Sequence, residues 1–167
     1  MKDITLSECS QSNSTENQND SSNQSIVIEV GVKLSQIEVL SLFNDFDDSS
    51  EVPLHEDLDF QMHSRKFADK AYFILAKIES RIIGFVAYYL NEEGKIAYIS
   101  EIIVHKNGRH RGIGHKMMVS LINAMGTSYN CIREVLKTNQ YARKFYEREG
   151  YNEIDDHGNK LLLEKVL

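Results

Sequence analysis

The stretch GRHRGIGHKMM occupies residues 108–118, and the rest of the chain is arranged around it. It combines glycines with arginines, histidines and a lysine, and it contains no acidic residue. The run IAYISEIIV before it is typical of a strand, and apolar residues recur at helical spacing after it. The stretch therefore predicts a loop that ends a strand and begins a helix.

Such a loop has the chemistry of an anion site. The first turn of a helix leaves backbone N–H groups without partners, and the helix dipole favours a negative charge there. Glycines let a phosphate approach those N–H groups closely. From these residues alone two interpretations remain open, namely a phosphate or pyrophosphate site and a tight basic connection. The spacing fits neither the P-loop nor the dinucleotide-binding glycine pattern.

The overall composition limits the class of protein. A chain of 167 residues predicts one domain with a real core, and the net charge of -6 disfavours a nucleic-acid partner. Cys9 and Cys131 form no metal-binding or redox spacing, so we expect no metal site and two free thiols in a reducing, cytoplasmic compartment. No run predicts a membrane span or a signal peptide, so we expect no membrane partner.

The chain divides into a tail and a domain. Residues 7–25 contain no aliphatic or aromatic side chain, which predicts that residues 1–25 form a disordered polar tail. Residues 26–167 predict a single folded domain. Its patterns give the order strand, helix, helix, three strands, helix, strand, helix and two strands, with the three consecutive strands forming an antiparallel meander. This order is typical of an α/β or α+β sandwich with a mixed sheet.

A second motif gives the glycine loop a meaning. Residues 139–151 read NQYARKFYEREGY and fit the pattern Asn-x-x-Ala-x-x-Phe-Tyr-Glu-x-x-Gly-Tyr. Together with Arg109-x-x-Gly112-x-Gly114, in this order, the motif resembles the GNAT superfamily of acetyl-CoA-dependent acetyltransferases. The resemblance covers roughly residues 72–167, while residues 26–70 fit only by position. It implies a GNAT-like fold, with a mostly antiparallel sheet of about six to seven strands flanked by about four helices.

The resemblance implies acetyl-CoA as cosubstrate and no metal. It assigns the pyrophosphate site to Arg109, His110, Arg111, Gly112, Ile113 and Gly114. It implies that the backbone of Ile102, Ile103 and Val104 faces the pantetheine arm and the acetyl carbonyl, and that Asn139 contacts the pantetheine from the other side.

The implied reaction is direct acyl transfer, in which an amine attacks the thioester and a transient oxyanion forms. Tyr146 occupies the family position of the acid that protonates the leaving thiolate, and a phenol with a pKa near about 10 stays protonated. Glu134 and Glu101 are the candidate bases that would accept the proton of the ammonium group. Either carboxylate is alternatively an ion-paired strand residue, with a chain of waters serving as the base.

The acceptor remains open at this level. The expected substrate is a small amine or an amino sugar, because an acidic surface steers cations. The alternatives are a protein or peptide N-acetyltransferase and a non-catalytic module that binds acyl-CoA. Dimers are common in the superfamily, so a homodimer is a further expectation.

Overall fold

The structure is a computed structural model that describes residues 25–49, 54–57 and 59–167. The predicted polar tail, residues 1–25, lies outside the described residues except for Ser25. Within the described residues, no helix has the length and apolar character needed to cross a membrane.

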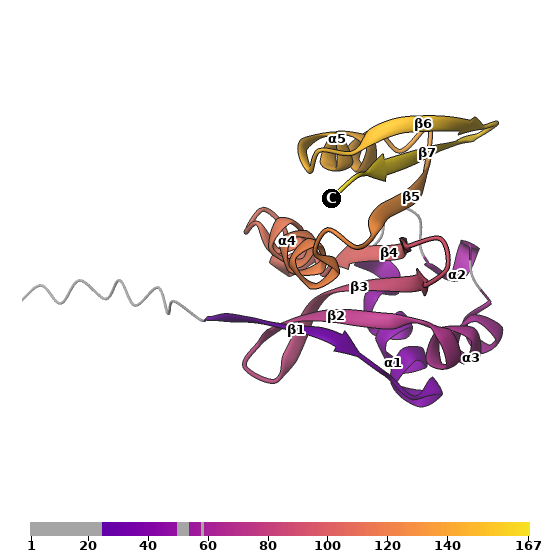
Figure 1. Ribbon diagram of the computed structural model, residues 1–167. Helices are drawn as coiled ribbons and strands as arrows, with labels where there is room; N and C mark the ends of the chain where they lie inside the picture. Colours follow the sequence, from indigo (N-terminus) through magenta and orange to yellow (C-terminus); the bar gives the residue numbers. More distant parts are fainter. Residues whose placement is uncertain (1–24, 50–53, 58) are drawn as a thin grey trace, which may run out of the picture.

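A mixed sheet of seven strands forms the centre of the described domain (Figure 1). The strands are β1 (Ile26–Val32), β2 (Tyr72–Ile78), β3 (Arg81–Asn91), β4 (Ile96–Val104), β5 (Asn130–Leu136), β6 (Asn152–His157) and β7 (Lys160–Lys165). Their spatial order is β1-β2-β3-β4-β5-β7-β6, so β1 and β6 are the edges. Only β4 and β5 pair in parallel, which confirms the predicted mixed, mostly antiparallel sheet and the meander of β2, β3 and β4.

The predicted helices also form, with short additions. The helices are α1 (Gln36–Phe46), α2 (Leu54–Asp57), α3 (Phe60–Lys70), α4 (Ile113–Met125) and α5 (Gln140–Arg148), with 3-10 turns η1 (Asp47–Ser49) and η2 (Lys106–Gly108). Helix α1 begins at a capping box, in which the backbone N–H of Ser35 donates to the Glu38 carboxylate at 2.8 Å. Helix α4 ends at Gly126, whose N–H donates to the carbonyl of Ile122.

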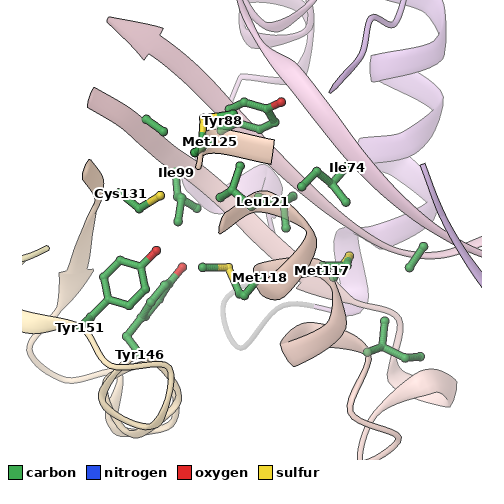
Figure 2. Packing of buried hydrophobic residues seen from close by; sticks show 14 of the residues in the cluster. Ile74, Tyr88, Ile99, Met117, Met118, Leu121, Met125, Cys131, Tyr146 and Tyr151 are labelled. Carbon is green, nitrogen blue, oxygen red and sulfur yellow. The ribbon is translucent and has the colours of Figure 1, made fainter. Parts of the chain in front are cut away.

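The helices bury the two faces of the sheet in separate cores. Helices α1 and α3 pack Val39, Phe43 and Phe67 against Phe73 and Phe85 on one face. On the other face, α4 and α5 pack against the sheet through a second cluster, part of which is drawn in Figure 2. Its central members are Ile74, Ile99, Met117, Met118, Leu121 and Tyr146. Two apolar layers around one sheet hold the central strands rigidly, which a site built on those strands requires.

The parallel pairing of β4 with β5 is short. It consists of the pairs Ile96–Asn130, Ala97–Cys131 and Tyr98–Ile132. A bulge follows on β4, because Tyr88 of β3 pairs with Ile99 and Ala87 pairs with Glu101, which leaves Ser100 as the extra residue. After the bulge, β4 continues to Val104 without a β5 ladder. The sheet is therefore open between these two strands along their C-terminal halves.

The core on the α4 face predicts a large difference between two substitutions in one helix. Leu121→Ala, at a fully buried position, should lower the free energy of unfolding by about 2–5 kcal/mol through lost burial and a residual cavity. Val119→Ala, at a position 38% exposed on the same helix, should change it by less than about 1 kcal/mol. Urea unfolding of both variants measures this, and equal losses would contradict the assigned burial.

Candidate active site

A cavity of about 800 Å³ opens where β4 and β5 separate. It is bounded by the C-terminal half of β4, by the glycine loop with the start of α4, and by α5. Its lining residues are Ser49, Ile102, Ile103, Val104, Gly108, Arg109, His110, Gly112, Ile113, Gly114, His115, Asn139, Tyr141, Ala142, Phe145, Tyr146, Arg148 and Glu149. All of the predicted cofactor-binding residues except Arg111 lie in this lining.

One end of the cavity is the N-terminus of α4. The helix-opening hydrogen bond runs from the N–H of Lys116 to the carbonyl of Gly112 at 3.0 Å. The N–H groups of Ile113, Gly114 and His115 therefore lack partners within the helix, and no side chain of the described residues caps them. Gly112 has φ +70° and open space where a side chain would begin, so a ligand can approach these donors. This arrangement suits a phosphate or pyrophosphate group.

The two sequence motifs meet at Gly114. A Cβ atom at this position would lie 3.2 Å from the ring of Phe145, which is closer than ordinary van der Waals contact. Glycine at this position therefore lets α4 and α5 approach each other. The close approach explains why the glycine loop and the α5 motif occur together, since each supplies one wall of the same cavity.

Cationic groups surround this end unevenly. The guanidinium of Arg109 donates to the carbonyl of Ser49, and Arg148 lines the cavity from α5. The ring of His115 contacts the carboxylate of Glu149 at 3.0 Å. Arg111 instead lines a smaller pocket of about 270 Å³ on the other side of the loop.

The β4 wall of the cavity follows directly from the bulge. Because the β5 ladder ends at Tyr98, the backbone of residues 102–104 has no ladder partner on that side. Ile102, Ile103 and Val104 all line the cavity. Backbone groups in this position can bind an extended ligand as an added strand would.

Tyr146 lines the cavity from α5. Its side chain is 1% exposed and packs edge-on against Phe145 and Tyr151, with ring centroids 5.3 and 5.1 Å away. Its hydroxyl is buried without a hydrogen-bond partner among the described residues. Burial raises the pKa of Tyr146 to about 12, and the charge of Arg133 opposes this rise. The phenol is therefore protonated at neutral pH and has an unused O–H donor.

The two predicted bases lie outside the cavity lining. Glu101 contacts the guanidinium of Arg133 at 3.8 Å, and both side chains are about one-fifth exposed, at 21% and 22%. The same guanidinium donates to the carbonyl of Ile99 at 3.0 Å. Arg133 therefore spans the gap between β5 and β4 at the point where their ladder has ended.

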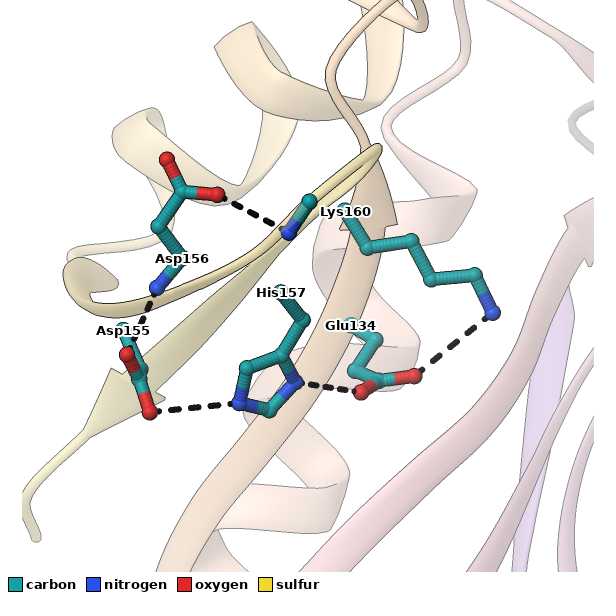
Figure 3. Close-up of polar contacts among 6 residues, drawn as sticks. Glu134, Asp155, Asp156, His157 and Lys160 are labelled. Atoms are coloured by element: carbon teal, nitrogen blue, oxygen red, sulfur yellow. Dashed lines mark hydrogen bonds and ion pairs between the residues drawn. The ribbon is translucent and has the colours of Figure 1, made fainter.

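Glu134 lies in a polar cluster with the β6–β7 hairpin (Figure 3). Its carboxylate contacts the ring of His157 at 2.8 Å and the ammonium of Lys160 at 3.6 Å. The other ring nitrogen of His157 contacts Asp155 at 3.2 Å. The hydrogen bond from His157 lowers the pKa of Glu134, which keeps this carboxylate ionised.

The sequence did not single out every residue of the cavity. The lining residues to which it assigned no binding role are Ser49, Gly108, His115, Tyr141, Ala142, Phe145, Arg148 and Glu149, although the two motifs include Gly108, His115, Ala142 and Phe145. Five of these lie on or next to α5 at spacings of one helical turn, so helical periodicity could have found them. Ser49 comes from a segment distant in sequence, and no local pattern connects it to the loop.

Cys131 is not a candidate nucleophile. It is fully buried in the core on the α4 face, and burial raises the pKa of its thiol to about 11. A protonated, inaccessible thiol is a poor nucleophile, so Cys131 is a small apolar core residue with a free thiol, as expected from its sequence.

Comparison with known proteins gives one family. A family model described as the acetyltransferase (GNAT) family matches residues 38–151. The probable spermine N(1)-acetyltransferase of Bacillus subtilis subsp. natto (strain BEST195) is 26% identical over 101 residues. That match covers 53% of this chain and 66% of the relative, so it spans a little less than two thirds of the relative's length.

Solved structures agree on the fold. The PaiA N-acetyltransferase of Thermoplasma acidophilum, in complex with coenzyme A, matches with a TM-score of 0.70 at 19% identity. The protein PH1933 of Pyrococcus horikoshii OT3 matches with a TM-score of 0.69 at 23% identity. Each match covers 86% of this chain and 99% of the other chain. At these identities the likeness establishes the architecture alone.

The anion site at α4 predicts a charge-specific effect. Gly112→Asp and Gly112→Asn strain the backbone similarly, because both residues tolerate the left-handed conformation, but only Asp adds a negative charge. Gly112→Asp should weaken coenzyme A binding at least about tenfold more than Gly112→Asn. Titration calorimetry measures both dissociation constants, and equal constants would contradict an anion site at this loop.

The cluster of Figure 3 predicts a pH-dependent contribution to stability. Hydrogen bonds to Glu134 and Asp155 raise the pKa of His157 above its ordinary 6.5. A raised pKa means that the stabilisation is complete below about pH 6.5 and is lost as the pH rises through the folded-state value. His157→Gln should therefore lower the melting temperature more at about pH 5.5 than at about pH 9. The same loss at both pH values would contradict this ion pairing.

Proposed function

Because the chain belongs to the GNAT acetyltransferase family, we propose that it transfers the acetyl group of acetyl-CoA directly to a primary amine. One observation carries the proposal. A single cavity is lined both by the start of α4, with its free N–H groups, and by Tyr146, whose buried hydroxyl has no hydrogen-bond partner among the described residues. The N–H groups suit a pyrophosphate, and the phenol suits a leaving group that needs a proton.

Different groups of the chain bind different parts of acetyl-CoA. The N–H groups at the start of α4 and the side chains of Arg109 and Arg148 bind the pyrophosphate region. The unpaired edge of β4 at residues 102–104 binds the pantetheine arm. Asn139 caps α5 by accepting from the N–H of Ala142 at 2.8 Å, which leaves its amide N–H groups as donors from the opposite wall.

The acyl-transfer step needs two stabilising groups. When the amine attacks, negative charge develops on the thioester oxygen. The donor proposed for it is the backbone N–H of Ile102, which points to the open side of β4, whereas the N–H of Ile103 points toward β3. The carbon–sulfur bond then breaks, and Tyr146 gives its proton to the sulfur. Its high pKa keeps the proton available at neutral pH and makes its transfer depend on the surrounding charges.

Of the two carboxylates, Glu101 is the better candidate for the base. It lies on β4, two residues before Ile103, and contacts Arg133 in the gap that leads toward Tyr146. Glu134 is bound to His157 and Lys160 on the hairpin side. We therefore assign Glu101 to accept the ammonium proton, directly or through water, and Glu134 to a structural ion pair.

The acceptor proposed is a small cationic amine. Tyr89 and Tyr98 pair across β3 and β4. Burial raises the pKa of both phenols, and the charge of Glu101 adds to the rise. A carboxylate beside aromatic rings suits an ammonium group. The relative named as a spermine acetyltransferase supports the same class of acceptor.

An acceptor screen tests the proposal. Wild-type protein is mixed with acetyl-CoA and, separately, spermidine, glucosamine and a peptide with a free amino terminus. Release of free thiol and a mass increase of the amine are followed. Transfer to spermidine supports the proposal, and transfer to glucosamine or the peptide alone replaces the acceptor class. Coenzyme binding without transfer to any amine would leave only an acyl-CoA-binding module.

The assigned acid predicts a selective loss of turnover. Tyr146→Phe should lower kcat about a hundredfold and leave the dissociation constant of coenzyme A nearly unchanged, because only the proton donor is removed. Tyr151→Phe is the matched control, since it also removes a buried hydroxyl but lies outside the cavity lining. If both variants behave alike, Tyr146 is not the acid.

A further inference from the structure

Arg133 is a charged residue placed inside the separation between β4 and β5. It belongs to β5, and it is the residue immediately after the last residue paired with β4. Its neighbours on the same face of β5, Cys131 and Val135, are buried in the apolar core on the α4 face. An arginine in this row is costly to bury unless its charge and its donors are used.

The contacts of Arg133 reach both strands and the helix. One guanidinium nitrogen donates to the carbonyl of Ile99, which follows the end of the ladder on β4. Another contacts the carboxylate of Glu101, beyond the bulge at Ser100. The carbonyl contact replaces one that a continued ladder would have supplied. Arg133 thereby stabilises β4 in its diverged position.

The charge of Arg133 acts on the acid as well as on the base candidate. Burial alone would lower the pKa of Arg133, but interactions with Glu101, Tyr146 and Tyr98 outweigh this effect and raise it. The residue therefore stays cationic. Its positive charge opposes the effect of burial on Tyr146, whose hydroxyl has no hydrogen-bond partner among the described residues.

We propose that Arg133 is a positioning residue for acyl transfer, holding β4 and β5 apart and supplying a fixed positive charge on the face of the sheet where Tyr146 packs. The inference rests on the proposed function. In the transfer step a carbon–nitrogen bond forms and the carbon–sulfur bond breaks. The sulfur takes the proton of Tyr146. The resulting phenolate is then reprotonated by the proton that the amine nitrogen releases. Negative charge develops first on the sulfur and then on the phenolate oxygen. A fixed guanidinium nearby stabilises both charges without having to move during the reaction.

The first test needs no acceptor. Coenzyme A is bound to wild-type protein, Arg133→Met and Arg133→Lys, and the ultraviolet absorbance of its thiolate is titrated against pH. The bound thiol should ionise at a pH about one unit higher in Arg133→Met than in wild type, with Arg133→Lys in between. Arg143→Met is the control, because Arg143 also donates to a backbone carbonyl, that of Lys137 at 3.5 Å, outside the cavity lining.

The second test uses turnover with the acceptor found in the screen. Arg133→Ala should lower kcat about tenfold to a hundredfold, with less than about a threefold change in the dissociation constant of coenzyme A. Guanidinium ion at non-denaturing concentration should restore part of kcat, whereas urea, which has a similar shape and no charge, should not. Equal rescue by both would mean that Arg133 only fills space, and would overturn the proposal.

The outcomes separate this inference from the proposed function. If the thiol titration is shifted in Arg133→Met relative to wild type but the wild-type protein acetylates no amine, the charge effect of Arg133 is supported, whereas the transferase assignment and the role of Arg133 in transfer are overturned. Turnover in wild type with an unshifted titration in Arg133→Met would overturn Arg133 alone. If the wild-type protein binds no coenzyme A, both are overturned.

Discussion

The short ladder between β4 and β5 is the constraint on which the site depends. Parallel strands in a sheet normally continue pairing, but here three residue pairs are followed by a bulge and divergence. The divergence exposes the backbone of one central strand inside an otherwise well-packed sheet, next to the start of α4. A continued ladder would use these backbone groups within the protein. The binding surface therefore exists because the sheet is incomplete at this point.

Keeping such an opening has energetic consequences. A buried hydroxyl without a partner, as in Tyr146, costs about 1–3 kcal/mol. An arginine in an apolar row is also unfavourable unless it is paired. The surrounding core offsets both costs, since α4 buries Met117, Met118 and Leu121 completely against the sheet. The stability of the core beside α4 thus compensates for Tyr146 and Arg133, whose arrangement is favourable for binding a ligand and unfavourable for the stability of the free protein.

Much of this could be predicted from the sequence, for identifiable reasons. The element order and the mixed sheet follow from strong periodicity, and α1 follows from the capping pair Ser35 and Glu38. The glycine loop was correctly placed between strand and helix because the residues before it have the composition of a strand and the apolar residues after it recur at helical spacing. The role of Gly114 was not visible, because its contact with Phe145 joins residues far apart in sequence.

The polar residues were harder to place than the apolar ones. Glu134 and Glu101 have similar local sequences, yet one joins the β6–β7 hairpin and the other contacts Arg133 across the gap. Which of these occurs depends on strand register and on the bulge at Ser100, and neither has a local signature. Arg133 itself was overlooked for the same reason, because its side chain contacts residues of β4 that have no backbone pairing with β5.

A crystal structure with coenzyme A bound tests the central claim most directly. The account predicts the pyrophosphate on the N–H groups of residues 113–115, the pantetheine along residues 102–104, and the sulfur within about 4 Å of the Tyr146 hydroxyl. A coenzyme bound elsewhere, or one whose sulfur points away from Tyr146 and the gap between β4 and β5, would contradict it.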